Sequence, residues 1–300
     1  MKKQPFLSKC CLFFIVAMLM VASSAQAMGI IVPKAQRFNP AMDDFGALTA
    51  ESDKTLGFGE VALGVHLNVS HEPLDTGDVK SPISDVLVKD LYTANLTAAY
   101  GIAQNFQIGI DVPFNATFSN MNAVSGVRED NFSTGDVRLK AKFRVFSGES
   151  FGVALIPFVN LSTGKKDLYL SEGRGGYGVK VATHADVTQS LTLYANAGVE
   201  LLGNSMSTGS PDYYSKWMQY AVGASYGFKE GKHKLIAEVN SETTLSRPYR
   251  HEWHSPVELL GALRCEIKPG LSVQLGAGTG LNNGMGAPLW RAFSGLYYRF

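Results

Sequence analysis

The chain has 300 residues, a formal net charge of +1 and 18% charged residues. This near-neutral balance gives no sign of the basic surface that nucleic-acid-binding proteins carry, so we predict no nucleic-acid partner. Its 31 glycines and 11% aromatic residues fit a closed, curved sheet better than a helical protein. No Pro-rich or Gly/Ser-rich linker divides the chain, so we expect one folded domain.

Residues 1–27 have the three parts of an export signal: a basic start, an apolar run over 10–22 and a small-residue cleavage site at 25–27. The apolar run is shorter than the ~20 residues that a transmembrane helix needs, and no later segment supplies one. Any membrane insertion is therefore expected to be by strands. Cys10 and Cys11 leave with the signal, so only Cys265 stays and no internal disulfide is possible.

Alternating segments of roughly ten to fourteen residues recur from about Leu56 to the end of the chain, as tilted membrane-spanning strands require. The chain closes on the aromatic Phe300, through which we expect the last strand to engage the barrel assembly machinery. We predict about twelve strands. They are expected near 57–70, 88–101, 105–117, 135–147, 150–162, 176–188, 190–203, 216–229, 232–244, 256–268, 270–281 and 289–300.

The connections between these segments alternate in length, and this alternation predicts the topology. Tight turns are expected at 101–104, 147–149, 187–189, 229–231 and 268–270, and longer connections near 71–87, 118–134, 163–175, 204–215, 245–255 and 282–288. Outer-membrane barrels have short periplasmic turns and long external loops. The sequence therefore predicts an all-β fold, a transmembrane antiparallel up-and-down β-barrel with both ends of the mature chain in the periplasm.

Side chains alternate between the two faces of the predicted wall. In 137–145 the odd positions are apolar, whereas Arg138, Lys140, Lys142 and Arg144 are basic. A basic side chain that faces lipid at the midplane of a barrel costs ~2–4 kcal/mol, so these four are expected to face the lumen.

The predicted strand order also places aromatic side chains at two depths, as expected for the aromatic girdles of a membrane barrel. The alternative is that they are ordinary strand aromatics, which β-propensity alone enriches. The expected periplasmic belt comprises Tyr100, Phe106, Phe228, Tyr298 and Phe300, and the external belt comprises Tyr92, Phe114, Tyr177 and Trp290.

Short stretches of the chain resemble two outer-membrane families. Residues 36–40 and 56–57, and later 73–74 and 101–113, are similar to the barrel module of multidomain OmpA-like proteins. The run Gly-Asp-Val-Arg-Leu-Lys at 135–140 also resembles channel-like proteins of the phenol-degradation (MetA-pathway) type. The resemblance implies an outer-membrane barrel of transporter-like type, without a known substrate.

The long OmpA-like proteins continue into a peptidoglycan-binding domain, whereas this sequence stops where its last predicted strand stops, so wall anchoring is not carried over. We expect a signal peptide over 1–27, a periplasmic N-terminal segment over 28–54 and the barrel over 55–300. The N-terminal segment either plugs the lumen or trails in the periplasm. The second interpretation is slightly favoured, because terminal segments are often poorly ordered unless they are tied down.

The openness of the barrel decides its function, and about twelve strands lie between small filled barrels and porins with aqueous channels. Charges of both signs on the inward face predict either a closing network of ion pairs or two facing walls that orient a polar solute. Strand pairing would place Asp111 roughly beside Lys140. The lumen and selectivity candidates are Arg138, Lys140, Lys142, Arg144, Asp111, Lys180, Asp186, Glu200, Glu238, Glu258 and Arg264.

The cationic row formed by Arg138, Lys140, Lys142 and Arg144 is the best candidate for ion selectivity, because rows of charged side chains set the electrostatic barrier in a channel. If the row lines an open path, small anions such as carboxylates would be favoured. The alternative is a solvated or salt-bridged lumen face.

Catalysis and metal binding have little support in the sequence. His184 and Asp186 share a face and His254 adjoins Ser255, but no serine and histidine form a hydrolase pattern with a third orienting group, so we predict no enzyme. The loop 250–254 has three possible zinc ligands, which a polar surface cluster explains better. We expect no cofactor and no metal.

The sequence therefore predicts a passive channel or transporter for small solutes, surrounded by lipid in the outer membrane of a Gram-negative bacterium. The main alternative is a closed structural or surface-interaction barrel whose external loops bind a partner. A lipid-hydrolysing barrel enzyme is a distant third. The solute stays unknown, because no motif identifies it.

Overall fold

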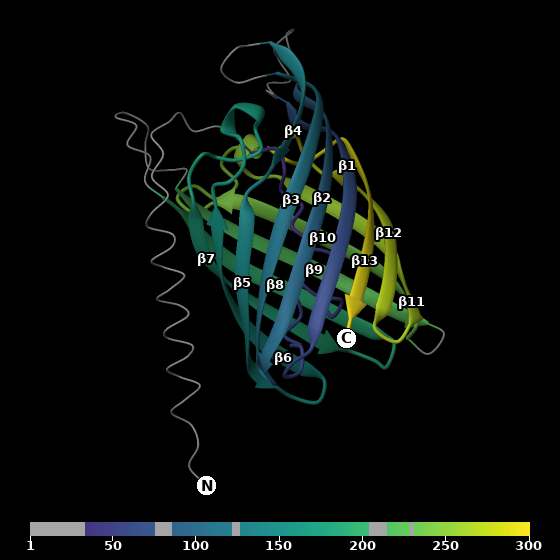
Figure 1. Ribbon diagram of the computed structural model, residues 1–300. Coiled ribbons are helices and arrows are strands. Elements are labelled where there is room, and N and C mark those ends of the chain that lie inside the picture. Colours follow the sequence, from purple (N-terminus) through teal and green to yellow (C-terminus); the bar gives the residue numbers. More distant parts are fainter. Residues whose placement is uncertain (1–33, 76–85, 122–126, 204–214, 229–230) are drawn as a thin grey trace.

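The computed structural model describes residues 34–75, 86–121, 127–203, 215–228 and 231–300 (Figure 1). Its strands form one antiparallel sheet that closes on itself, and the described loops contain two short 3-10 helices. No described helix is long and apolar enough to cross a membrane. The elements are β1 (Val61–Asp75), β2 (Val86–Ala103), β3 (Phe106–Met121), β4 (Arg128–Thr134), β5 (Val137–Ser147), β6 (Phe151–Leu161), η1 (Lys166–Leu168), β7 (Gly176–Asp186), β8 (Leu191–Leu202), β9 (Lys216–Phe228), β10 (His233–Thr244), η3 (Glu252–His254), β11 (Val257–Lys268), β12 (Leu271–Gly280) and β13 (Trp290–Arg299).

The wall has twelve positions, because β4 and β5 are two parts of one strand. One part of β3 pairs with β4 and the other with β5, in registers that include Phe114 with Thr134 and Phe106 with Phe143. The barrel closes where β1 pairs with β13. The predicted all-β, twelve-stranded antiparallel barrel is therefore confirmed. The loop expected over 118–134 is wrong in part, because β3 continues to Met121 and β4 returns from Arg128.

The first strand begins at Val61, four residues later than expected, because residues 57–60 form a turn. Gly59 adopts a positive φ of 84°, and its N–H donates to the carbonyl oxygen of Gly101 at 2.9 Å. A Cβ on Gly101 would lie 1.8 Å from the carbonyl oxygen of Gly57, so this close approach requires a glycine.

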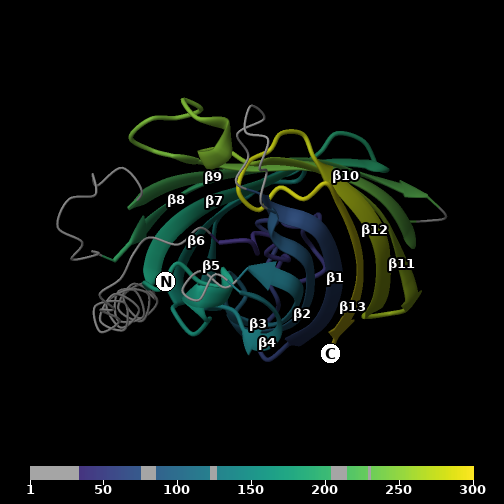
Figure 2. The ribbon, with the colours of Figure 1, turned by 90° about the horizontal axis from the view of Figure 1, so that it is seen from above.

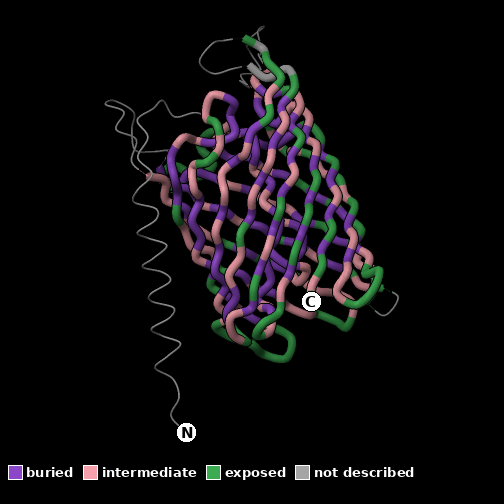
Figure 3. Tube along the Cα trace, viewed as in Figure 1, coloured by how far each residue is buried: buried purple, intermediate pink, exposed green. Residues whose placement is uncertain are grey.

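Burial alternates along the strands (Figure 3). The exposed outer positions are mostly apolar, whereas the buried inner positions hold most of the polar side chains of the wall. On β1, Leu63, Val65 and Leu67 are exposed, whereas His66 and Asn68 are buried inside the barrel. An apolar outer band is the surface that a barrel presents to lipid. The fold is therefore that of a transmembrane barrel.

Exposed aromatic side chains mark both ends of this outer face, as expected for two girdles. Two predicted members differ: Phe106 is buried and stacks on Phe143 with ring centroids 4.4 Å apart, and Phe114 is half-buried. Those at the end with the short turns, the short-turn end, are Tyr100, Phe228, Tyr298 and Phe300. Those at the opposite, long-loop end are Tyr92, Tyr177 and Trp290.

Residues 34–56, which we call the plug segment, lie inside the barrel (Figure 2, purple). Near the short-turn end, the N–H of Leu56 donates to the side chain of Gln107 at 2.7 Å. At the long-loop end, the N–H of Ala35 donates to the carbonyl oxygen of Tyr169 at 2.9 Å. The segment thus runs the length of the lumen, and the trailing-tail interpretation is wrong for residues 34–54. Residues 28–33 of the expected N-terminal segment lie outside the described residues.

Apolar contacts help to hold the plug segment in the lumen. Phe38 and Leu48 belong to a buried cluster with wall residues that include Ile236, Leu260 and Phe293. Phe38 and Phe293 lie with ring centroids 5.3 Å apart. At this depth the lumen is therefore a packed core, as in small barrels, although the barrel has twelve wall positions.

Candidate functional site in the barrel lumen

The structure places the predicted lumen candidates on the inner face of the wall, but most of them contact other protein groups instead of open water. Three are partly exposed: Arg144, Lys180 and Asp186. The buried ones are Arg138, Lys140, Lys142, Asp111, Glu200, Glu238, Glu258 and Arg264.

The cationic row on β5 meets the acidic side chains of the plug segment. Lys142 Nζ lies 2.7 Å from an oxygen of Asp43 and 3.1 Å from one of Glu51, and Lys140 Nζ lies 3.0 Å from the other oxygen of Glu51. The side chains of Lys142 and Asp43 are both 0% exposed. The geometry therefore supports the salt-bridged alternative for this part of the row, while a role in ion selectivity stays a prediction.

A second ionic cluster lies closer to the short-turn end. Arg144 Nε lies 3.2 Å from an oxygen of Asp53, and His184 Nδ1 forms a hydrogen bond with the other oxygen of Asp53. Asp186 lies 3.4 Å from His184 Nε2. This cluster fixes the end of the plug segment that leads into β1.

Two wall residues satisfy the backbone of a tight turn in the plug segment. Arg264 Nη1 donates to the carbonyl oxygens of Asp44 and Gly46 at 2.9 and 2.8 Å. The carboxylate of Glu238 accepts hydrogen bonds from the N–H groups of residues 48–50 at 2.9–3.1 Å. Buried backbone groups need such partners, so both side chains hold the plug segment directly.

Two further candidates pair within the wall. Glu258 accepts a hydrogen bond from Arg291 Nε at 2.6 Å, and Asp111 accepts one from Asn95 at 2.9 Å. In the β3–β5 register Asp111 lies opposite Arg138, so its expected position beside Lys140 is wrong by two residues. The difference arises because the observed pairs are centred one residue earlier than a pair of Asp111 with Lys140 would require.

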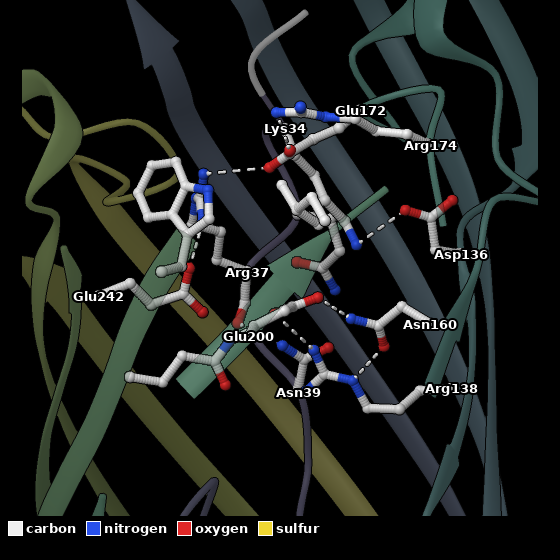
Figure 4. A pocket seen from close by; sticks show the side chains of 14 residues that line it. Lys34, Arg37, Asn39, Asp136, Arg138, Asn160, Glu172, Arg174, Glu200 and Glu242 are labelled. Carbon is white, nitrogen blue, oxygen red and sulfur yellow. Dashed lines mark hydrogen bonds and ion pairs between the residues drawn. The ribbon is translucent and has the colours of Figure 1, made fainter. Parts of the chain in front are cut away.

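Two adjoining cavities, which we together call the chamber, lie in the lumen toward the long-loop end. Figure 4 shows the first of them. Their empty volumes are about 440 and 390 Å³, including space that is open to solvent. Both plug and wall residues line the chamber. The residues shared by the two cavities are Arg37, Asn39, Arg138, Gln219 and Glu242.

Arg37 of the plug segment connects three sides of the chamber. Its guanidinium forms a hydrogen bond with Glu242 on β10 and lies 4.8 Å from the ring centre of Trp217 on β9. Its Nη2 atom lies 3.9 Å from a carboxylate oxygen of Glu172, in the loop after η1. Arg174 lies 3.5 Å from the other oxygen of Glu172.

The remaining carboxylates of the chamber are also paired. Lys34 Nζ lies 3.3 Å from an oxygen of Asp136, just before β5. Arg138 Nη2 lies 3.8 Å from Glu200, which also accepts a hydrogen bond from Gln219 at 2.6 Å. The lumen at the long-loop end is thus polar, and most of its charged side chains form ion pairs.

Burial raises the pKa of Glu172 from its ordinary 4.5 to about 7, although the guanidinium groups of Arg37 and Arg174 oppose this shift. The group lies in a loop at the long-loop end, beside the chamber. Its charge therefore changes between pH 6 and 8.

Several chamber residues, which come from the plug segment, a loop and β9, were not recognisable in the sequence. Arg37, Glu172 and Trp217 lie far apart in the sequence, and their meeting depends on the plug position. One signal was present: Asp43 and Glu51 precede the barrel, and their negative charges are opposite to those of the cationic row.

Of the groups considered for catalysis, His184 and Asp186 contact each other, but Ser255 lies far from both. His184 bonds Asp53 toward the short-turn end, whereas Ser255 lies at the long-loop end with its hydroxyl 2.9 Å from that of Thr243. Within the described ranges, no group of three His, Cys, Asp or Glu side chains is placed to hold a metal ion.

Comparison with protein families decides the relationship of the chain. The model of the family described as the MetA-pathway of phenol degradation matches residues 85–300. The chain belongs to this family. The match confirms the resemblance drawn from 135–140, whereas the OmpA-like resemblance stays a prediction. A search of curated proteins finds no match.

Solved structures share the fold at low sequence identity. The COG4313 outer membrane channel from Pseudomonas putida F1 has a TM-score of 0.61 and 13% identity, over 83% of this chain and 98% of that one. The NanC porin has a TM-score of 0.50 and 11% identity, over 79% of this chain and 98% of that one. These similarities show that the phenol-degradation family member has the fold of outer-membrane barrels.

Proposed function

We propose that the protein is a passive outer-membrane channel for small solutes, and that a solute passes when the plug segment moves aside. The observation that carries this proposal is the polar chamber at the long-loop end, next to a plug segment that runs the length of the lumen. The family description suggests small aromatic compounds as one class of solute. A removable signal over 1–27 would deliver the protein to the membrane.

The contacts of the plug segment are compatible with movement, because they are non-covalent. Lys142 and Arg144 form ion pairs with side chains of the plug segment, whereas Glu238 and Arg264 form hydrogen bonds with its backbone. The turn at 57–60 leads directly into β1 and would remain anchored by Gly101. Exchange of these contacts for water would open a path along the wall.

The filled lumen also favours a second candidate function, a closed barrel that binds a partner through its external loops. The burial of Lys142 and Asp43 is the specific observation in its favour. Loop binding would not require movement of the plug segment, whereas passage of solutes would. The two functions are therefore separable by conductance.

Planar-bilayer recording of residues 28–300 tests the proposal, with a variant that lacks 34–54 as a comparison. We expect small, discrete current steps from the full mature chain and a larger conductance from the deletion variant. If the deletion variant does not fold, Asp43→Asn with Glu51→Gln removes the same ionic attachment. Folded protein that stays silent in every form would support the closed barrel.

A further inference from the structure

One lysine departs from the charge pairing of the chamber. The side chains that line the two cavities include five cations and four carboxylates. Each carboxylate has a cation within ion-pair distance: Asp136 has Lys34, Glu172 has Arg174, Glu200 has Arg138 and Glu242 has Arg37. The side chain of the fifth cation, Lys180, has no hydrogen-bond or ion-pair partner among the described residues.

Lys180 lies on the inner face of β7, opposite Ile156 on β6 and Gly198 on β8. A Cβ on Gly198 would lie 3.1 Å from the Cα and Cβ atoms of Lys180, so the glycine leaves room beside the lysine stem. The ammonium group therefore projects from the wall into the chamber without a neighbouring side chain that neutralises it.

Nearby charges do not supply the missing partner. Lys140 and Arg138 add positive potential around Lys180, while Glu51 and Glu242 attract it from beyond ion-pair distance. Glu51 is already held by Lys140, and Glu242 by Arg37. An unpaired ammonium in a protein lumen attracts an anion from solution.

Neutral polar groups surround the ammonium in the same cavity. Asn240 on β10 lines the cavity and, like Lys180, has no side-chain partner among the described residues. Ala221 on β9 adds apolar surface to the lining. The cavity has about 390 Å³ of empty space, part of which is open to solvent, so a solute can reach it from the chamber.

We propose that this cavity binds a small organic carboxylate, with the carboxylate group on Lys180 and a hydrogen bond from the Asn240 amide. The inference deepens the proposed function, since it names the class of solute that pauses in the chamber. An ammonium with neutral donors recognises one negative charge, and the apolar lining accommodates a compact carbon body.

Calorimetric titration of the detergent-solubilised mature protein with benzoate tests the site at low ionic strength. Benzamide, which has nearly the same shape and no charge, is the matched ligand, and sodium chloride tests for a bare anion. The variants are Lys180→Met, which keeps the length of the side chain, Lys180→Arg, which keeps the charge, and Asn240→Ala. Lys89→Met removes an exposed lysine outside the chamber as the control.

We expect wild-type protein and Lys89→Met to bind benzoate, and Lys180→Met to bind it at least tenfold more weakly. Asn240→Ala should reduce the affinity for benzoate less than Lys180→Met does, and Lys180→Arg should keep most of the wild-type affinity. Equal binding of benzamide, full competition by millimolar chloride, absence of benzoate binding or an unchanged Lys180→Met variant would each overturn the site. Circular dichroism verifies that each variant keeps its strands.

Failure of the carboxylate site and failure of the channel would give different results. Benzoate binding by a barrel that never conducts would leave the carboxylate site intact and remove the channel. Conduction without benzoate binding would leave the channel and remove the site.

Discussion

At the scale of single residues, the lumen is a place where charges of opposite sign neutralise each other. Lys142 illustrates this, because its ammonium group forms ion pairs with both Asp43 and Glu51. Such pairs contribute little net stability compared with an apolar core, but the loss of one partner leaves an uncompensated buried charge. The inward charges of this barrel therefore specify where the plug segment lies.

Glu172 gives the chamber a dependence on pH. Because its pKa is raised from 4.5 to about 7 in the folded protein, the folded state binds more protons between these values. The free energy of unfolding should therefore fall as the pH rises from about 4.5 to about 7, by at most about 3 kcal/mol, and stay lower above that range. Denaturant unfolding in micelles at pH 5 and pH 8 measures this difference.

The variant Glu172→Gln should lose the part of the pH dependence that comes from Glu172, so its free energy of unfolding should differ less between pH 5 and pH 8. Glu149→Gln, at an exposed position near the short turns, serves as the matched control and should behave as wild type. An equal pH dependence in Glu172→Gln and wild type would show that another group is responsible.

At the scale of elements, the strands were more predictable from the sequence than the plug segment. Strand positions follow from alternation with a period of two, which depends only on local sequence. The break at 135–136, which separates β4 from β5, was missed because six of the seven residues of β4 are polar and show no apolar alternation. The plug segment has no periodic pattern, and its position depends on contacts such as Asp43 with Lys142, which lie 99 residues apart.

The attachment of the plug segment should be sensitive to Lys142. In Lys142→Met the buried carboxylates of Asp43 and Glu51 lose their shared partner, which costs ~3–5 kcal/mol when a buried pair is broken. We expect limited proteolysis of the folded barrel to cut within 34–56 much faster than in wild type.

Two comparisons make this result specific. Lys216→Met removes an exposed charge at the start of β9 and should leave the cleavage rate unchanged. Asp43→Asn combined with Lys142→Met should recover part of the protection, since it removes one uncompensated carboxylate. If Lys142→Met were cleaved at the wild-type rate, the ion pairs would not hold the plug segment.

At the scale of the whole molecule, topology follows from connection lengths. The sequence predicted the alternation of short and long connections, and the strand pairings close the barrel as expected. It could not decide whether the lumen is open, because that depends on which groups meet inside. The eleven charged candidates lie on the inner face of the wall, yet their partners became evident only with the plug segment in place.

The course of the plug segment places the start of the described chain at the long-loop end, where Lys34 meets Asp136. If the long loops are external, Lys34→Cys should react with a membrane-impermeant maleimide on intact cells. Phe58→Cys, at the short-turn end and 77% exposed, should react only after lysis. Both variants need a Cys265→Ala background, and the reverse pattern would contradict this orientation.

A disulfide between the plug segment and the wall tests the central claim most directly. A Cβ on Gly223 would lie 3.4 Å from the Cβ of Ala47, close to disulfide geometry, so Ala47→Cys with Gly223→Cys in the Cys265→Ala background should crosslink. Single-channel recording then compares the oxidised and reduced forms. We predict that the oxidised form is silent and that reduction restores current steps, as in the Cys265→Ala parent. Equal conductance in both forms would contradict a channel that opens by movement of the plug segment.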